Sequence, residues 1–137
     1  MEYFQTALII ATFLCSLVAG FLFAFAVVVM PGIKNLNDKE YIRAFQVMDL
    51  VIQNNQPIFM LVWIGSLVAL IASAVVGFAQ LDGIGRVLIV FTALVYLLGV
   101  HLPTMTINIP LNNQLQSLDV NASDETTHKA APSRAAL

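Results

Sequence analysis

The chain has 137 residues, of which 59% are hydrophobic and only 10% are charged, and its mean hydropathy is +0.86. Soluble domains usually carry about 25% charged residues, and a soluble domain of this length leaves too much surface exposed to hide so much apolar area. The composition therefore predicts an integral membrane protein that is surrounded by membrane lipid. A net charge of −2 without a basic stripe argues against a nucleic-acid partner.

Three segments contain no Asp, Glu, Lys or Arg, and they cover residues 3–33, 50–81 and 87–118. A membrane helix needs about 20 apolar residues, so each segment is long enough to span a bilayer. We place the spanning helices near residues 5–30, 57–80 and 87–107. The first helix is not a typical signal peptide, because no basic residue precedes it and its apolar run is too long.

The basic residues predict the orientation of these helices. The 31–56 connection holds three basic residues, the 81–86 turn holds one, and the chain after residue 114 holds two. Connections rich in Lys and Arg usually stay in the cytoplasm. We therefore expect the N-terminus outside, with the 31–56 connection and the tail in the cytoplasm, in a bacterial inner membrane.

Residues 38–53 predict an amphipathic helix between the first two spans. Asn37 or Asp38 can cap its start. Polar residues recur three or four apart and form one narrow stripe on an otherwise apolar helix: Lys39, Arg43, Gln46, Asp49 and Gln53. A helix of this kind fits the membrane interface or a groove among other helices.

Small residues lie four apart in two of the spans. They are Gly65, Ala69, Ser73 and Gly77 in the second, and Ser16, Gly20 and Ala24 in the first. Such spacing lets helix backbones approach closely in lipid, so both rows predict helix–helix packing. The fold expected is an all-α transmembrane bundle with an interfacial helix, forming one domain over residues 1–113 before a polar, flexible tail, 114–137.

His101 is the one ionisable residue well inside a predicted span, which makes it a candidate functional residue. A proline two residues later removes a backbone hydrogen bond and predicts a kink. Thr104 and Asn108 lie on the same helix face as His101, and Asn112 continues that row if the helix continues beyond Pro110.

The stretch INIPLNNQL, residues 107–115, places three asparagines after an apolar run, on the cytoplasmic side with the 38–53 helix. Gln46 and Asp49 are therefore expected to meet these amides and close a membrane-embedded pocket. Two interpretations stay open: a ligand site, or an interfacial cap that satisfies the last helix carbonyls. His101 likewise has two, a catalytic or ligand role and a hydrogen bond to a neighbouring helix. No metal is expected, because one His and one Asp fall short of a usual ligand set.

Four features carry a resemblance to the anthrone-oxygenase-like family of small membrane proteins. They are AGFLFAFAVVVMPG, RAFQVMD with a following NQPIF, YLLGVHLPTMTINIPLNNQL, and the order of these stretches over residues 15–119. The resemblance implies a four-helix membrane bundle, and for characterised members the oxidation of an anthrone to an anthraquinone with O2 and no evident cofactor. The chain departs from the family pattern in two ways: Asp49 stands where Asn is expected in many members, and only three membrane helices are predicted. The fourth is expected to be missing or supplied by another chain.

Two functions from different classes compete. In a cofactor-free oxygenase acting on a flat, hydrophobic aromatic molecule, His101 or Asp49 would be the base. The residues expected to bind the substrate are Gln46, Tyr96, Thr104, Asn108, Asn112 and Asn113. Aromatic side chains such as Phe45, Phe59 and Tyr96 would stack on its rings. The alternative is a non-catalytic subunit that forms a homo-oligomer or docks on a larger membrane complex and binds a lipid, pigment or quinone.

Overall fold

The structure, a computed structural model, describes residues 2–119, and these residues are helical apart from short connections. In chain order the elements are α1 (Glu2–Ala24), the π-helical turn η1 (Phe25–Val29), α2 (Met30–Ile33), α3 (Asp38–Gln53), α4 (Pro57–Gln80), α5 (Gly83–Tyr96), the π-helical turns η2 (Leu97–His101) and η3 (Thr104–Asn108), and α6 (Ile109–Gln116). Three continuous rods, Glu2–Ile33, Pro57–Gln80 and Gly83–Gln116, are long and apolar enough to cross a membrane. The chain is therefore an integral membrane protein with an all-α fold, as the composition predicts.

The helices α3 and α4 have the bounds that the sequence predicts, because side chains cap both. The Asn37 side-chain oxygen accepts a hydrogen bond of 2.9 Å from the Glu40 backbone N–H at the start of α3. The Gln56 side chain accepts from the Phe59 backbone N–H at the start of α4. Between the two helices Asn55 takes a left-handed conformation, with φ of 55°, which turns the chain sharply.

The other two rods are longer than predicted. The first continues to Ile33 rather than ending near 30, and the third runs from Gly83 to Gln116 rather than from 87 to 107. Residues 114–116 therefore belong to α6, and residues 120–137 of the expected tail lie outside the described residues. The division into a domain and a tail stays a prediction.

Three π-helical turns explain why prolines do not end these rods. Each turn finishes two residues before a proline: Pro31, Pro103 or Pro110. In each, the residue just before the proline donates its N–H to the carbonyl five residues earlier, as Leu102 does to Leu97. A proline ring clashes with the carbonyl four residues back, and the wider turn makes room for it while the helix continues.

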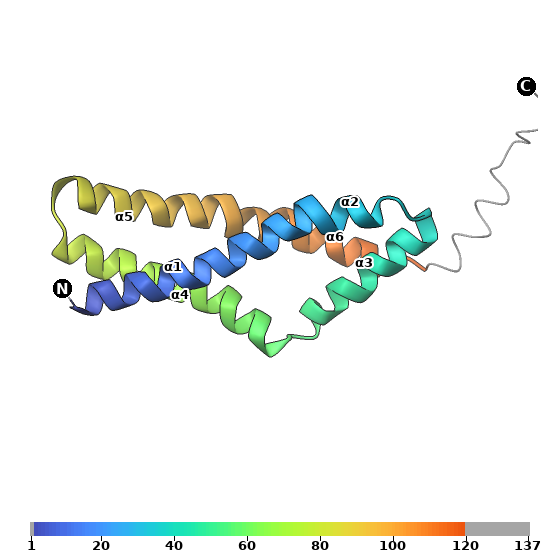
Figure 1. Cartoon of the computed structure of the whole chain (residues 1–137), viewed down its shortest axis with the longest axis horizontal. Coiled ribbons are helices and arrows are strands. Elements are labelled where there is room, and N and C mark those ends of the chain that lie inside the picture. Colours follow the sequence, from blue (N-terminus) through green and yellow to red (C-terminus); the bar gives the residue numbers. More distant parts are fainter. Residues whose placement is uncertain (1, 120–137) are drawn as a thin grey trace, which may run out of the picture.

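The row of small residues on α4 packs as predicted. Ser73 and Gly77 of this row are buried, and α4 packs mainly against α1 and also against α5 (Figure 1). A Cβ atom added to Gly77 would lie 2.7 Å from Cε2 of the Phe4 ring and 3.3 Å from Cγ1 of Ile89. Only glycine therefore lets α1 and α5 approach α4 this closely.

The corresponding row on α1 contacts no other helix among the described residues. For these residues, the prediction that this row packs against another helix is wrong. Ser16, Gly20 and Ala24 are all exposed, and nothing lies within 4 Å of a Cβ atom added to Gly20. The row turns outward because α1 uses another face, with Phe4, Ala11 and Val18, against the bundle. The Ser16 hydroxyl donates to the Thr12 carbonyl at 2.7 Å, so its polar atom is satisfied inside the helix.

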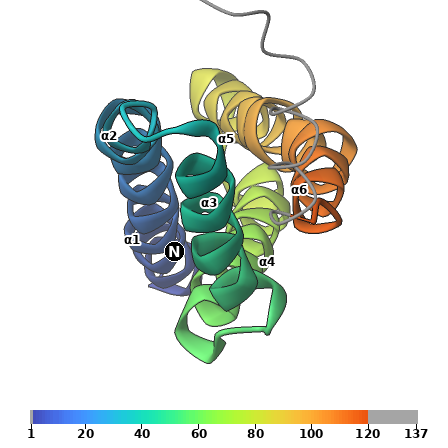
Figure 2. The same cartoon turned by 90° about the vertical axis from the view of Figure 1, so that its right-hand side faces the viewer.

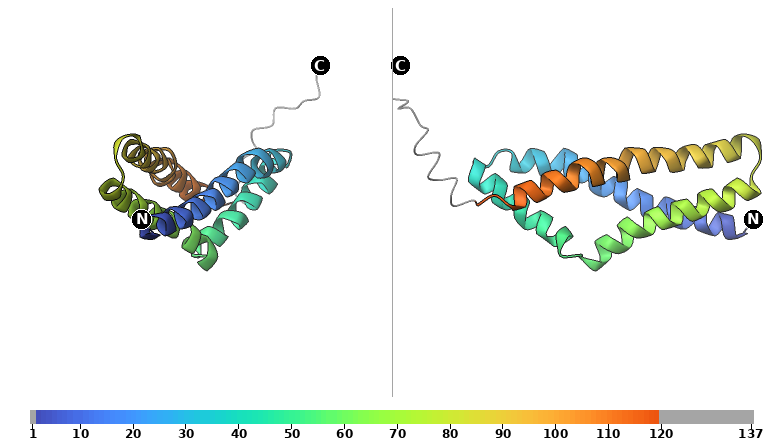
Figure 3. Two further views of the ribbon diagram at one scale, coloured as in Figure 1. Left: turned by 60° about the vertical axis from the view of Figure 1, so that its left-hand side comes forward. Right: turned by 180° about the vertical axis from the view of Figure 1, so that it is seen from behind.

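The amphipathic helix α3 lies between α2 and α6 at one end of the bundle (Figure 2). With 24 residues, α4 is about 36 Å long, whereas the outer rods of 32 and 34 residues reach about 48 and 51 Å. The three rods are level at the end of the bundle that holds the N-terminus of the chain and the α4–α5 turn. The extra length of the two outer rods therefore projects at the opposite end, where α3 runs beside α6 (Figures 1 and 3). A hydrocarbon core is about 30 Å thick, which puts α3 at the level of the membrane interface.

Candidate functional site

A buried carboxylate joins α3 to α6. Asp49 is only 5% exposed and accepts hydrogen bonds from three neutral amides: Gln53 Nε2 at 2.6 Å, Asn112 Nδ2 at 2.8 Å and Gln116 Nε2 at 3.1 Å. Gln53 Nε2 also donates to Asn113 Oδ1 at 3.3 Å. We call Asp49 and these four amide residues the carboxylate–amide cluster.

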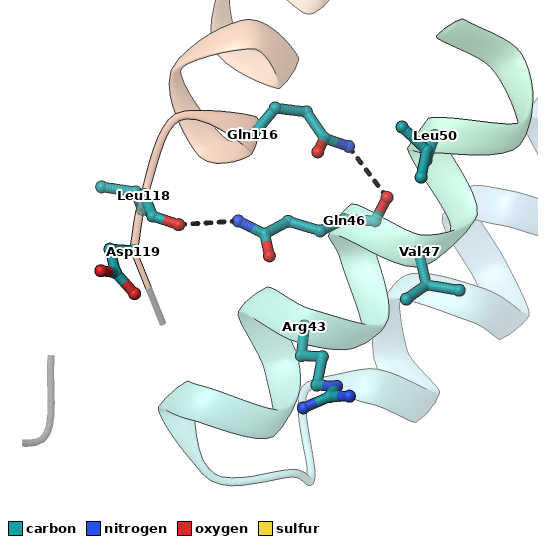
Figure 4. A pocket seen from close by; sticks show the side chains of 7 residues that line it. All are labelled: Arg43, Gln46, Val47, Leu50, Gln116, Leu118 and Asp119. Atoms are coloured by element: carbon teal, nitrogen blue, oxygen red, sulfur yellow. Dashed lines mark hydrogen bonds between the residues drawn. The ribbon is translucent and has the colours of Figure 1, made fainter. Parts of the chain in front are cut away.

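Backbone carbonyls at the end of α6 extend this network. Gln46 Nε2 donates to the carbonyls of Leu115 at 2.8 Å and Leu118 at 3.0 Å. In return Gln116 Nε2 donates to the Gln46 backbone carbonyl at 2.9 Å, and Figure 4 shows both side chains reaching across the space between the helices. The predicted meeting of the α3 polar stripe with the amides of the third span is therefore observed.

The hydrogen bonds of the cluster indicate a structural role for Asp49. A carboxylate offers about four acceptor positions, and three of them are occupied by protein N–H groups. Two of these donors also bond other protein oxygens: Gln53 Nε2 bonds Asn113 Oδ1, and Gln116 Nε2 bonds the Gln46 backbone carbonyl. The arrangement therefore works mainly as a clamp between α3 and α6.

Two predicted substrate-binding residues, Thr104 and Asn108, bond no other predicted site residue within residues 2–119. Asn108 is exposed, and its amide makes no hydrogen bond within residues 2–119. The Thr104 hydroxyl donates to the Val100 carbonyl at 2.7 Å, one turn earlier in its own helix. Neither side chain joins Asp49, and their predicted role in binding a substrate stays a prediction.

His101 occupies a different environment, among aromatic rings. It is 6% exposed, and neither buried ring nitrogen makes a well-formed hydrogen bond to the described part of the chain, although the Trp63 backbone carbonyl lies near the imidazole. The centroid of its ring lies 4.9 Å from that of Trp63 on α4 and 5.0 Å from that of Tyr96 on α5. The Tyr96 hydroxyl is 2.8 Å from Ser66 Oγ. A buried polar group normally finds a partner, so an unpartnered imidazole at the last residue of a π-helical turn marks a candidate functional site.

The aromatic surroundings of His101 continue across the bundle. Trp63 stacks on Phe59 with centroids 5.8 Å apart, Phe59 meets Phe21 of α1 at 5.5 Å, and Phe21 meets Phe25 at 6.0 Å. Of these four rings, the sequence analysis proposes only Phe59 and misses Trp63, Phe21 and Phe25. The four-residue spacing of Phe59 with Trp63, and of Phe21 with Phe25, is the signal that could have found them, because it places two rings on one helix face.

The two centres are separate. Asn112, which binds Asp49, lies 11 residues after His101, or about 16 Å along the helix axis. The two candidate bases therefore lie in different surroundings, and a catalytic role for either stays a prediction. Among residues 2–119, no three His, Cys, Asp or Glu side chains form a group that could hold a metal ion.

Comparison with known proteins assigns the chain to a family. A family model described as anthrone oxygenase matches residues 59–137, more than half of the chain. The match begins in the first turn of α4 and includes Trp63, Tyr96, His101 and the amides of α6. No curated protein and no solved structure matches the chain. The chain therefore belongs to the anthrone oxygenase family.

Proposed function

We propose that this membrane protein oxidises a flat, electron-rich aromatic substrate of the anthrone type with O2, and that His101 is the base that starts the reaction. One observation carries the proposal, the buried imidazole whose two nitrogens have no partner among the described residues. Leaving such a group unsatisfied costs about 1–3 kcal/mol. That cost is understandable if a ligand supplies the missing partner.

The proposed reaction needs no oxidant other than O2. His101 removes a proton from the CH2 group between two aromatic rings, and the resulting carbanion is stabilised by delocalisation into those rings and the neighbouring carbonyl. The carbanion reduces O2 and forms a C–O bond, and the proton returned by His101 completes a hydroperoxide, CH–OOH. Loss of water from this group leaves the new C=O. In sum, CH2 and O2 become C=O and H2O, a four-electron oxidation of carbon matched by the reduction of O2.

The surroundings of His101 suit this chemistry better than those of Asp49. Three amide N–H groups already occupy the carboxylate of Asp49, whereas His101 has both nitrogens unoccupied. Trp63 and Tyr96 lie beside the imidazole and would stack on a planar substrate. The Tyr96 hydroxyl donates to Ser66 Oγ, because Ser66 gives its own hydrogen to the Trp63 carbonyl, so Tyr96 Oη would accept a hydrogen bond from a substrate hydroxyl. The remaining candidate for orienting the substrate is the exposed amide of Asn108.

Turnover by the purified full chain in detergent tests the proposal. Oxygen uptake and quinone absorbance are measured with an anthrone, and spontaneous oxidation without protein is subtracted. We expect His101→Gln to lower the rate by about 10²–10⁴-fold, as loss of a general base does. Thr106→Val is the matched control, because Thr106 lies on the same rod and its exposed hydroxyl only bonds the Leu102 carbonyl. Equal activity of His101→Gln and the unaltered chain would refute the role of His101.

A non-catalytic subunit is the second candidate, and a specific observation favours it. The small residues Ser16, Gly20 and Ala24 face outward on α1, with open space over Gly20, and such a face suits close packing against a helix of another chain. No turnover by the purified chain, together with co-purification in a larger complex that Gly20→Leu dissociates, would favour this function over oxidation.

A further inference from the structure

A groove of about 420 Å³ opens between α3 and the end of α6, away from His101. Figure 4 shows the seven side chains that line it: Arg43, Gln46, Val47, Leu50, Gln116, Leu118 and Asp119. One wall is therefore the outward face of α3 and the other is the end of the third rod. The groove adjoins the carboxylate–amide cluster through Gln116, which lines the groove and donates to both Asp49 and the Gln46 backbone carbonyl.

The position of the groove relates it to the membrane interface. It lies where the two outer rods project beyond α4, at the level expected for lipid headgroups. Along α3 the lining residues change from charged to aliphatic toward the bilayer: Arg43 comes first, then Val47, which is 60% exposed, and Leu50, which is 48% exposed. A phospholipid has the same order of chemistry, with its phosphate outside and its acyl chains inside.

The polar atoms of the groove suit a ligand that carries both a phosphate and hydrogen-bond donors. Arg43 is exposed and makes no hydrogen bond or ion pair within the described residues, so its guanidinium can bind a phosphate in a bidentate manner. The side-chain N–H groups of Gln46 and Gln116 donate to protein oxygens. Their side-chain carbonyl oxygens accept nothing from residues 2–119. Two such acceptors call for a ligand with N–H or O–H donors.

We propose that this groove binds the headgroup of a phospholipid that carries hydrogen-bond donors, with the phosphate on Arg43, the donors on Gln46 and Gln116, and an acyl chain over Val47 and Leu50. Ethanolamine and glycerol headgroups share this chemistry, whereas choline has the phosphate but no donor. The lipid would fasten α3 to α6 from the membrane side. The proposal is independent of any reaction at His101.

Lipid binding by the full chain in detergent tests this site. Bound lipids are counted by native mass spectrometry as phosphatidylethanolamine, phosphatidylglycerol or phosphatidylcholine of identical acyl chains is titrated in. We expect at least the ethanolamine lipid to bind several-fold more tightly than phosphatidylcholine. Arg43→Gln should weaken that binding about tenfold, the effect of losing a charge-assisted hydrogen bond, and added salt should weaken it too.

Lys34→Gln is the matched control, because Lys34 is an exposed cation of the same connection and lines a different groove. It should leave the preference and the affinity unchanged, and thermal unfolding should show that both variants are folded. Tight binding of the ethanolamine lipid identifies the ammonium as the donor, because this lipid and phosphatidylcholine carry the same net charge. Tight binding of the glycerol lipid alone would reflect its net negative charge and would overturn the assignment of donors to Gln46 and Gln116. Equal affinity for phosphatidylcholine, or an affinity that Arg43→Gln does not change, overturns the proposal.

Discussion

Asp49 is a buried carboxylate whose hydrogen-bond partners in residues 2–119 are neutral amides. Burying such a group costs free energy unless hydrogen bonds replace the water it loses. Because the donors come from both α3 and α6, the same bonds that satisfy Asp49 hold the two helices together. The polar stripe that contains Asp49 was predictable from its three- and four-residue spacing, whereas the identity of its donors depends on how far α6 continues past Pro110.

Removing this carboxylate should weaken the α3–α6 contact. We expect Asp49→Ala to lower the free energy of unfolding by about 1–3 kcal/mol, because buried amide donors lose their acceptor. Thermal unfolding in detergent, followed by the fluorescence of Trp63, the single tryptophan of the chain, measures the change. Asp82→Ala is the control, since Asp82 forms only an exposed pair with Arg86 at 3.4 Å, and such pairs contribute little. A similar loss in both variants would contradict the clamp.

His101 should behave in the opposite way, since its ring nitrogens have no partner among the described residues. Replacing it with an apolar side chain of similar size removes a buried, unsatisfied polar group, so His101→Leu should stabilise the fold by about 1 kcal/mol or more. The same variant should lose the proposed oxidation. Melting temperature and turnover measured on one preparation test both halves. A lower melting temperature would indicate that the imidazole serves the fold.

At the scale of elements, prolines and small residues decide how the rods run and pack. A capping residue made the start of α3 predictable, and the apolar segment that follows Gln56 made the bounds of α4 predictable. Prolines misled the prediction of where the first and third rods end, because π-helical turns before Pro31 and Pro110 let the helix continue. Spacing alone also could not tell which row of small residues faces another helix. That choice depends on which face of α1 fits α4, a property of the assembled bundle.

The two glycine environments therefore predict opposite responses to one substitution. Gly77→Leu should destabilise the bundle by about 1–3 kcal/mol, because overpacking a tight contact forces neighbours to move, here Phe4 and Ile89. Gly20→Leu should cause no loss, because the position is open and leucine favours a helix over glycine. Thermal unfolding of the two variants in the same detergent compares them directly. A loss of stability in Gly20→Leu would show that α1 is packed on that face.

At the scale of the whole molecule, the sequence predicted the number of spans, the interfacial helix and the meeting of α3 with the amides. These features follow from composition, periodicity and a two-sided membrane. The environment of His101 could not be predicted in this way, because its aromatic neighbours lie on α4 and α5 and are set by how the rods pack side by side. The two candidate bases are apart for the same reason: a helix that continues through Pro103 and Pro110 separates His101 from Asn112 by several turns.

The distribution of basic residues also leads us to propose an orientation for the whole bundle. The connection containing α3 carries three basic residues, whereas the α4–α5 turn has Arg86, so α3 should face the cytoplasm. Single cysteines test this in a Cys15→Ser background, which has no other thiol. A maleimide that cannot cross membranes should label Ile84→Cys, at a site that is 73% exposed, in intact cells. It should label Leu36→Cys, at a site that is 41% exposed, only after the membrane is opened. This pattern would place the proposed lipid groove in the cytoplasmic leaflet, and the reverse pattern would place it in the outer one and refute the orientation.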